Sequence, residues 1–200
     1  QLCGTLGKGQ KILILNNPCN PTGAVYPDQE LQALAKVCRE EEVIVISDEI
    51  YSLIDFRKEK FSSIGRYLPE STVVTGGMSK AFSAGGWRLG LAFVPDAMSD
   101  MIKPWNALIS ETFSCVNAPV QYAALEAFSQ FEALRPQIQR FTEIHSVAGS
   151  YLFKRFMQMD LNCPEPEGAF YLFPDFQNHR EIFKKRGITK CHELVNDLLN

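Results

Sequence analysis

The chain has 200 residues, of which 46% are hydrophobic and 22% charged, and its formal net charge is −3 at pH 7. This length and hydrophobic content suffice to bury a sizeable core, so we expect a soluble globular protein. Because the net charge is slightly negative and the two signs are mixed along the chain, no basic stripe for nucleic acid is present. We therefore expect no nucleic-acid partner.

Cysteine usage and hydropathy exclude several further classes. The six cysteines are scattered, without a Cys-x-x-Cys pair or a histidine at metal-ligand spacing: Cys3, Cys19, Cys38, Cys115, Cys163 and Cys191. We interpret them as reduced thiols in the cytoplasm and expect no metal site. No apolar stretch approaches the roughly 20 residues that span a bilayer, and no basic and apolar leader opens the chain. Neither export nor membrane insertion is expected.

The first part of the chain alternates between strand and helix patterns. Residues 11–15 form a short apolar run, which predicts a buried strand that stops at the turn-forming segment 16–23. A helix that ends near Glu42 is predicted next. Residues 43–46 are continuously apolar, as is typical of a strand buried on both faces, and the polar segment 47–51 follows them.

Two further strands are predicted at residues 72–75 and 89–94. Recurring strand and helix patterns favour an α/β layered sheet, in which ligands gather at the carboxyl ends of the strands. Asn20, Asp48 and Lys80 each come just after a predicted strand. We therefore expect three separate segments to meet in one crevice.

Beyond about residue 103 the pattern changes to long helices. Apolar residues keep helical spacing across 120–131 and again across 138–156, where Pro136 is expected to open the second helix. Residues 169–173 then predict a strand with aromatic packing. These features indicate a second domain that is joined to the first through the long helix.

Lys80 lies in a glycine-containing run, residues 75–90, and Arg88 follows it eight positions later. A lysine amine attacks a carbonyl only when its neutral form is accessible, and nearby glycines let the backbone approach a bulky ligand. Arg88 adds a planar, permanently charged group that suits a phosphate. This arrangement indicates a protein that holds an aldehyde cofactor covalently and binds its phosphate.

Three separated motifs make the chain resemble the pyridoxal-phosphate-dependent aminotransferases of class I and II, the fold type I superfamily. They are residues 17–23 (NPCNPTG), residues 47–51 (SDEIY), and residues 77–80 (GMSK) together with 87–90 (WRLG). Their order and separations fit the family as well as their content does. Residues 167–171 (EGAFY) also resemble the C-terminal domain of the family, so the similarity runs through nearly the whole chain.

The resemblance implies a fold and a domain organisation. Residues 1–102 would be the second half of the large domain, which binds pyridoxal phosphate (PLP) on a mostly parallel sheet. Residues 103–200 would be connecting helices and part of a smaller α+β domain. Because the chain opens on Gln1 and closes within a helical pattern, we expect a fragment of a longer protein, without the stacking aromatic, the phosphate loop and the substrate-carboxylate arginine of the family.

The resemblance also implies roles for five residues. Lys80 would hold the cofactor covalently and then move a proton as general base and acid. Asp48 would pair with the protonated ring nitrogen. Tyr51 and Asn20 would bind the phenolic oxygen, and Arg88 would hold the phosphate. Many relatives have a hydroxyl residue where this chain has Gly77, so one phosphate contact is expected to be missing or supplied elsewhere.

Each of these residues also has an ordinary structural interpretation. Lys80 and Arg88 would then be surface charges, Asp48 and Asn20 turn residues, and Tyr51 a core aromatic. Their joint placement in three motifs favours the functional interpretation. The three histidines have no acid or nucleophile at a recognisable spacing, and we interpret them as surface or packing residues.

The leading hypothesis is a homodimeric aminotransferase that exchanges an amino group between an amino acid and a 2-oxo acid. One alternative is a PLP-dependent lyase of the same fold, such as a carbon-sulfur lyase, because the shared residues build the electron sink without choosing which bond breaks. A second alternative is a non-catalytic interaction or dimerisation module. The motifs do not identify the amino acid.

Overall fold

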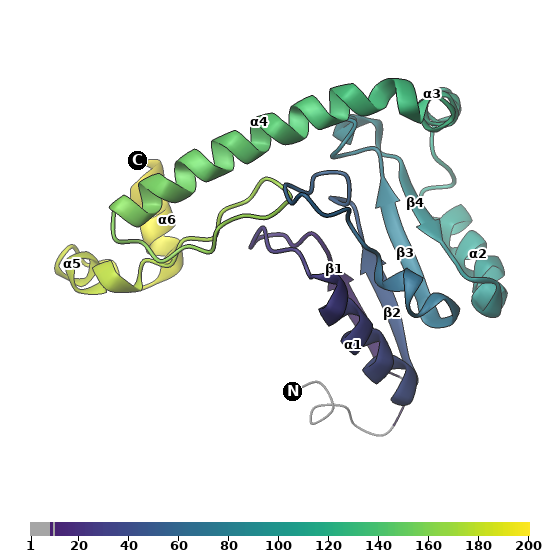
Figure 1. Cartoon of the computed structure of the whole chain (residues 1–200), viewed down its shortest axis with the longest axis horizontal. Helices are drawn as coiled ribbons and strands as arrows, with labels where there is room; N and C mark the ends of the chain where they lie inside the picture. The colour runs from purple at the N-terminus through teal and green to yellow at the C-terminus, as the bar shows by residue number, and fades with distance from the viewer. Residues whose placement is uncertain (1–8, 10) are drawn as a thin grey trace.

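A four-stranded sheet with the order β1-β2-β3-β4 is present in the computed structural model, which describes Gly9 and residues 11–200 (Figure 1). The first three strands are parallel and the last is antiparallel to its neighbour. The strands are β1 (Lys11–Asn16), β2 (Val43–Asp48), β3 (Thr72–Gly77) and β4 (Gly90–Phe93). The predicted α/β fold with a mostly parallel sheet is therefore confirmed, and the four strands predicted within residues 11–94 lie where they were expected.

The helix α1 (Asp28–Glu40) connects β1 to β2 and covers one face of the sheet (Figure 1). Its buried residues, Leu31, Ala35 and Cys38, share a core cluster with the inward-facing residues of β1 and β2. The helix ends slightly before the predicted Glu42, whose φ of 54° is left-handed and incompatible with a continued helix. The predicted helix is thus confirmed, with a shorter end.

The prediction that β1 is a buried strand is wrong for one of its faces. Ile12 and Ile14 are 63% and 73% exposed, whereas Leu15 is buried against α1. In β2, Val43 and Val45 are buried while the alternate isoleucines are half-buried. Successive side chains of a strand point to opposite faces, and α1 covers only one of these faces.

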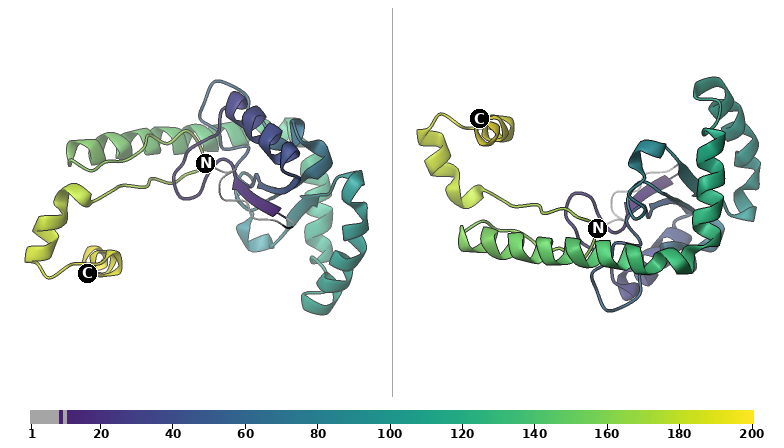
Figure 2. Two further views of the ribbon diagram at one scale, coloured as in Figure 1. Left: turned by 90° about the horizontal axis from the view of Figure 1, so that it is seen from below. Right: turned by 90° about the horizontal axis from the view of Figure 1, so that it is seen from above.

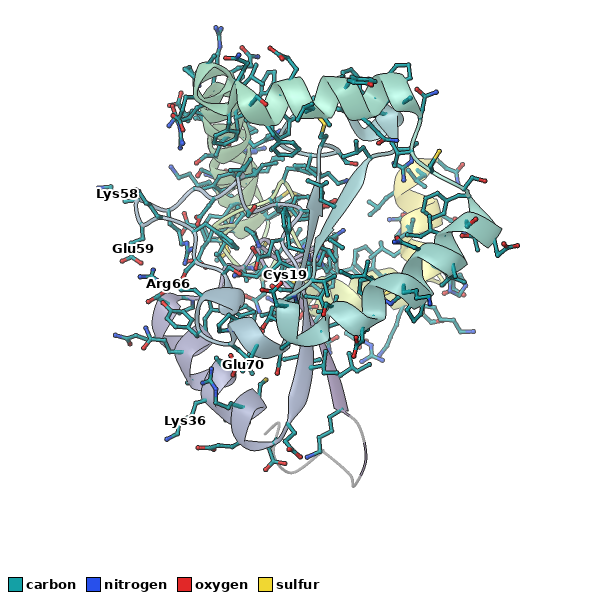
Figure 3. All side chains as sticks on the ribbon, turned by 90° about the vertical axis from the view of Figure 1, so that its right-hand side faces the viewer. Cys19, Lys36, Lys58, Glu59, Arg66 and Glu70 are labelled. Atoms are coloured by element: carbon teal, nitrogen blue, oxygen red, sulfur yellow. The ribbon has the colours of Figure 1, made fainter. Side chains whose placement is uncertain are left out.

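The connection from β2 to β3 contains two short 3-10 turns in place of an α-helix. They are η2 (Ile64–Arg66) and η3 (Pro69–Ser71). Arg39 of α1 forms an ion pair with Glu70 of η3 at 2.7 Å, on the side of the sheet where Lys36 and Glu70 project (Figure 3). Both charges are substantially exposed, so this pair adds little stability.

Helices dominate the second half of the chain. After η5 (Asp96–Met101) come α2 (Ile102–Thr112), α3 (Ala118–Ser129) and the long α4 (Phe131–Gln158), which passes over the end of the sheet (Figure 1). The prediction that Pro136 opens the second helix is wrong, because Pro136 lies inside α4. The preceding residues already form a helical turn, in which the N–H groups of Ala133 and Leu134 donate to the Gln130 carbonyl. Pro136 therefore forgoes one backbone hydrogen bond within the helix.

After α4 the chain forms a long hairpin, residues 161–176, that runs back alongside α4 toward the sheet (Figure 2). A single bridge between Asn162 and Asp175 closes its base. The predicted strand at 169–173 is wrong, because this segment joins no ladder and Ala169 has a left-handed φ of 56°. The chain then continues through three short helical elements, and the helix expected near the end is present: η6 (Gln177–His179), α5 (Arg180–Lys185) and α6 (Cys191–Leu199).

The hairpin tip, residues 167–169, is bonded to two loops at the end of the sheet. The N–H groups of Glu167 and Gly168 donate to the Gly23 carbonyl at 2.8 and 3.0 Å. The N–H of Ala169 donates to the Ile54 carbonyl at 2.8 Å, and Ala169 is fully buried. The tip therefore joins the loop after β1 to the loop after β2.

Neither a membrane-spanning helix nor a metal-ligand cluster occurs in the described residues. No helix within residues 11–200 is long and apolar enough to cross a membrane. No group of three or more potential metal-ligating side chains occurs in the same part of the chain. The cysteines from Cys19 onward are free thiols, and Cys3 lies outside the described residues. The domain division at residue 102 stays a prediction.

Gly168→Ala is expected to destabilise the protein by about 1–3 kcal/mol, because it overpacks the hairpin tip. A Cβ at this position would lie 2.8 Å from the Ile54 carbonyl oxygen and 2.9 Å from Cγ2 of Val25. Urea unfolding measures the change. Gly86→Ala is the matched control, because no atom lies within 4 Å of its added Cβ. Equal stability of the two variants would contradict the packing described for the tip.

Candidate functional site

The last residues of β1 and β2 lie in one row across the sheet with Thr75, which is near the end of β3. In the parallel register, Asn16 of β1 is opposite Asp48 of β2, which is opposite Thr75 of β3. Backbone bonding continues past the strands, since the Asn17 N–H donates to the Asp48 carbonyl at 3.1 Å and the Glu49 N–H donates to the Thr75 carbonyl at 2.8 Å. The loops that follow these strands therefore leave the sheet at the same edge.

Asn16 links two of the predicted site residues. Its Oδ1 accepts a hydrogen bond from the Asn20 N–H at 2.6 Å, and its Nδ2 donates to the Asp48 carbonyl at 3.2 Å. The sequence indicated only a turn former at Asn16. The structure thus fixes the backbone of Asn20 beside Asp48, while the Asn20 side chain stays exposed.

Asp48 is half-buried at the end of β2. Its Oδ1 accepts a hydrogen bond from the Ile50 N–H at 3.3 Å, which is the turn-capping contact of the ordinary structural interpretation. This contact uses one lone pair of a group that offers four. Asp48 can therefore cap the turn and bind a cationic partner at the same time.

Next to Asp48, the buried carboxyl group of Glu49 accepts two serine hydrogen bonds. The Ser47 and Ser63 hydroxyls donate to its Oε1 at 2.8 and 2.5 Å. Burial raises the pKa of Glu49, the two serine bonds oppose this rise, and the charge of Asp48 adds to it. The Ser63 contact fixes the chain that follows the SDEIY motif against the end of β2.

Lys80 is held in a tight loop between β3 and β4. The Ala84 N–H donates to the Met78 carbonyl and the Ser83 N–H donates to the Lys80 carbonyl, at 3.2 and 3.0 Å. Met78, Ala84 and Leu89 are buried together against Ala124 of α3. This packing anchors both ends of the loop and leaves Lys80 half-buried between them.

The structure brings the Lys80 amine to an aromatic cluster. Its Nζ lies 5.5 Å from the ring centroid of Tyr51 and 5.6 Å from that of Phe170, within the range of a cation–π interaction. Tyr51 is buried, and its hydroxyl lies 2.6 Å from the hydroxyl of Tyr171. The ring of Tyr51 packs edge-on against Phe170 and Tyr171, so the predicted aromatic packing of this segment is confirmed.

Phe170 and Tyr171 are the site residues that sequence reasoning missed. Their motif contributes to the resemblance, but the sequence alone indicates no role for either side chain. The available signal is the adjacency of two aromatic residues in a segment that resembles the family. The contact between Tyr171 and Tyr51 could not be predicted, because the two residues are 120 positions apart in the sequence. His145 packs against Phe170 with ring centroids 5.2 Å apart, as a packing interpretation of this histidine expects.

Arg88 lies in the same loop system but has a local contact. It follows η4 (Gly85–Trp87) in a left-handed conformation with φ of 57°. Its Nη1 donates to the Gly85 carbonyl at 2.8 Å, and the side chain is exposed. The structure therefore shows the guanidinium folded onto its own loop and accessible to solvent.

Glycines leave space around the Lys80 loop. A Cβ added at Gly76 or Gly86 would meet no atom within 4 Å. Gly77 has a φ of 157° and would place a Cβ 2.7 Å from the Leu89 carbonyl oxygen, so a hydroxyl residue is sterically excluded here. The backbone is thus uncovered at Gly76 and Gly86, whereas Gly77 is needed for close strand contact.

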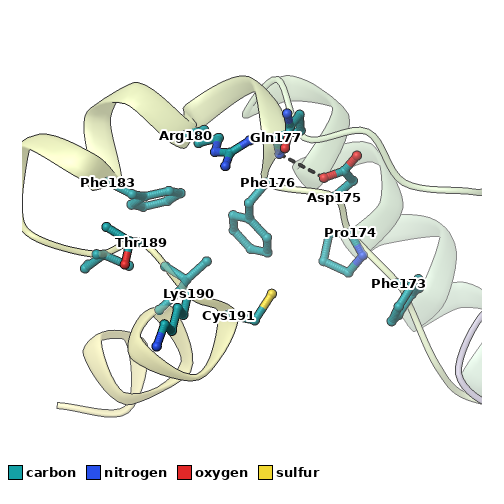
Figure 4. A pocket seen from close by; sticks show the side chains of 12 residues that line it. Phe173, Pro174, Asp175, Phe176, Gln177, Arg180, Phe183, Thr189, Lys190 and Cys191 are labelled. Atoms are coloured by element: carbon teal, nitrogen blue, oxygen red, sulfur yellow. Dashed lines mark hydrogen bonds between the residues drawn. The ribbon is translucent and has the colours of Figure 1, made fainter.

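A separate hollow of about 480 Å³ lies far along the chain, between the hairpin and the last two helices (Figure 4). Aromatic residues line much of it, including Phe176 and Phe183, whose ring centroids are 6.1 Å apart. Arg180 and Lys190 contribute cationic groups to the lining. None of the predicted site residues lines it, and the candidate site stays at the edge of the sheet.

The family model described as "Aminotransferase class I and II" matches residues 1–200. The chain belongs to the class I and II aminotransferases. It is 32% identical to an aspartate aminotransferase of Bacillus subtilis (strain 168), over 100% of this chain and 49% of that protein. It is 35% identical to an aspartate aminotransferase of Geobacillus stearothermophilus, over 94% of this chain and 47% of that protein.

Solved structures of aminotransferases share the fold. A double mutant of Thermus thermophilus aspartate aminotransferase superposes with a TM-score of 0.82 at 31% identity, over 94% of this chain and 50% of that chain. The aromatic aminotransferase from Pyrococcus horikoshii OT3 gives a TM-score of 0.80 at 30% identity, over 92% of this chain and 51% of that chain. The chain thus spans about half the length of the relatives it matches.

The donor set of the site fits pyridoxal phosphate. This cofactor offers an aldehyde, a basic ring nitrogen, an acidic phenolic oxygen and a phosphate, and the chain offers a matching group for each. The amine of Lys80, the carboxylate of Asp48, the amide of Asn20 and the hydroxyl of Tyr51 belong to loops that leave the sheet at one edge. Arg88 supplies a guanidinium from the Lys80 loop.

Glu49→Gln is expected to make the protein progressively more stable, relative to wild type, as the pH rises from about 4 toward 7. The pKa of Glu49 is raised by burial, so above the unfolded pKa of about 4.3 the native state binds more protons than the unfolded state. In the wild type, the contribution of Glu49 to the free energy of unfolding therefore decreases as the pH rises. The glutamine keeps an oxygen that can accept both serine bonds.

Thermal or urea unfolding at several pH values measures this difference. Glu126→Gln is the control, because Glu126 is exposed on α3. A difference between wild type and Glu49→Gln that stays constant across this pH range would contradict the buried, charge-disfavouring environment of Glu49.

Proposed function

We propose that this chain carries the cofactor-binding part of a PLP-dependent aminotransferase, which transfers an amino group between an amino acid and a 2-oxo acid. One observation carries the proposal: the Lys80 amine lies over the rings of Tyr51 and Phe170, at the sheet edge that also presents Asp48. Membership of the class I and II family supports it.

When bound, PLP supplies an aldehyde that a lysine or substrate amine can join and a ring that accepts electrons. Lys80 would hold the cofactor through its Nζ and, once displaced by the substrate amine, would take and return the proton at the substrate α-carbon. The Tyr51 and Phe170 rings limit the space into which the released amine can move, which keeps the base close to its proton.

Asp48 would bind the protonated ring nitrogen. Its half-buried carboxylate keeps one oxygen on the Ile50 N–H, which holds the group in one orientation. A charge-assisted hydrogen bond of this kind contributes about 1.5–3 kcal/mol. The negative charge of Asp48 thereby favours the cationic ring, the form that best withdraws electrons.

Tyr51 and Asn20 would bind the phenolic oxygen of the cofactor. Tyr51 presents its hydroxyl from a buried ring, and Asn20 presents an exposed amide from a backbone that Asn16 fixes. Arg88 would bind the phosphate through its planar guanidinium. Its exposed position means that only the bond to the Gly85 carbonyl has to be exchanged.

The cellular setting and assembly belong to the same proposal. We infer a cytoplasmic enzyme of amino-acid metabolism that works as a homodimer, since closed two-fold assemblies are the commonest among soluble oligomers. The relatives are called aspartate, aspartate/prephenate and aromatic aminotransferases. This range of names supports the reaction type and leaves the amino acid open.

In the intact protein, Lys80→Ala is expected to lower 2-oxo-acid-dependent amino transfer by roughly 10²–10⁴-fold or more, because both covalent attachment and proton transfer are lost. An assay of amino acid consumed and new amino acid formed, with added PLP, measures it. Lys103→Ala is the control, since Lys103 is an exposed residue of α2.

The same assay separates the reaction types. Formation of pyruvate and ammonia without a 2-oxo acid would contradict the transferase and indicate a lyase. Unchanged turnover in Lys80→Ala would contradict the role of this residue.

A further inference from the structure

The hydroxyl groups of Tyr51 and Tyr171 form a pair in the core of the site. Their oxygens are 2.6 Å apart, and the ring centroids lie 5.6 Å apart with an interplanar angle of 85°. Tyr51 is only 3% exposed, so its hydroxyl has few alternative partners. The two tyrosines come from the loop after β2 and from the hairpin after α4, which are distant in sequence.

Proton counting assigns a direction to this pair. Each phenol has one proton to donate and two lone pairs that accept. A Tyr51 hydroxyl that donates to Tyr171 has no proton left for a cofactor oxygen. A Tyr51 hydroxyl that accepts from Tyr171 keeps its own proton for that oxygen, and accepting a bond polarises the O–H and makes it a stronger donor.

Tyr171 is suited to the donor role. Burial first, and then the hydrogen bond with Tyr51, raises the pKa of Tyr171 above its ordinary value, while the charge of Lys80 opposes this rise. Tyr171 therefore keeps its proton at neutral pH. A protonated phenol that is held against Tyr51 is able to donate to it.

The hairpin tip fixes Tyr171 in place. Ala169, two residues earlier, is fully buried and its N–H donates to the Ile54 carbonyl at 2.8 Å. Ile54 in turn donates its own N–H to the Tyr51 carbonyl at 2.7 Å. The backbones of the two tyrosines are thus connected through Ile54, which limits the relative movement of their hydroxyl groups.

We propose that Tyr171 is a positioning residue for Tyr51: its hydroxyl donates to Tyr51 Oη and directs the Tyr51 proton to the phenolic oxygen of the cofactor. This inference rests on the proposed function and deepens it. It makes the hairpin after α4 a part of the cofactor site, because a residue of that hairpin controls a donor that belongs to the sheet edge.

The test is the pH dependence of the visible absorbance of PLP attached to Lys80. When the lysine-linked nitrogen loses its proton, the phenolic oxygen keeps an uncompensated negative charge, and a donor at that oxygen lowers the pH midpoint. Tyr171→Phe keeps the ring and removes the hydroxyl. It is expected to raise the midpoint by several tenths of a pH unit, the scale set by a weakened neutral hydrogen bond.

A double-mutant cycle with Tyr51→Phe tests whether Tyr171 acts on the cofactor oxygen through Tyr51. Tyr51→Phe alone is expected to raise the midpoint more than Tyr171→Phe does, and adding Tyr171→Phe to it is expected to change nothing further. Tyr151→Phe is the matched control, because Tyr151 is 62% exposed on α4. A Tyr171→Phe shift that persists in the Tyr51→Phe background, a lowered midpoint, or no shift would overturn the inference.

A second readout does not need the cofactor. In protein labelled with ¹³C at tyrosine Cζ, the Tyr51 resonance is expected to move in Tyr171→Phe and to stay in place in Tyr151→Phe. An unmoved Tyr51 resonance overturns the hydrogen bond itself. If the unchanged protein shows no Lys80-linked absorbance, the proposed function is overturned and the inference with it, whereas normal absorbance with an unmoved midpoint overturns only the inference.

Discussion

The parallel pairing of three strands is the constraint on which the site depends. Because Asn16, Asp48 and Thr75 are opposite one another in the ladder, the chain must leave each strand at the same edge of the sheet. Backbone bonds just beyond the strand ends continue this alignment into the loops. A shift of one residue in register would turn every side chain to the other face, and Asp48 would no longer lie on the side where the loops meet.

The hairpin after α4 is the second structural requirement. Its tip is bonded to the Gly23 and Ile54 carbonyls, and its aromatic residues pack on Tyr51 and around the Lys80 amine. A residue with a Cβ has no room at Gly168. The loops at the sheet edge are thereby fixed by a segment that follows them by more than a hundred residues, which makes a cofactor site at this edge dependent on both halves of the chain.

The sheet could be predicted from the sequence, and candidate site residues could be named, because the signals of both are local. The runs at residues 11–15 and 43–46 are apolar over consecutive positions, and the motifs around Asp48 and Lys80 combine residue types whose chemistry is specific. The predictions that were wrong concern features that depend on contacts with other segments. The exposure of Ile12 and Ile14 follows from which face α1 covers, and the start of α4 before Pro136 follows from a turn that the preceding residues form.

The pairing of Tyr51 with Tyr171 shows the same limit within the site. Residues 169–173 have the composition of a strand, yet Ala169 adopts a left-handed conformation at the tip, and the isolated bridges of this region lie outside the segment, at Gly168 and Asp175. Propensity describes the local preference, whereas the contact with Gly23 and Ile54 decides the backbone. The role proposed for Tyr171 therefore rests on a contact that exists only when two distant segments are placed side by side.

Reductive trapping tests the central claim most directly. The purified protein would be incubated with pyridoxal phosphate, reduced with borohydride and digested, and the modified peptide would be identified by mass. We expect one adduct per chain, on Lys80, because the loop between β3 and β4 places this amine beside Tyr51 and Phe170. Labelling that is spread over exposed lysines such as Lys36 and Lys58, with Lys80 unmodified, would contradict the site.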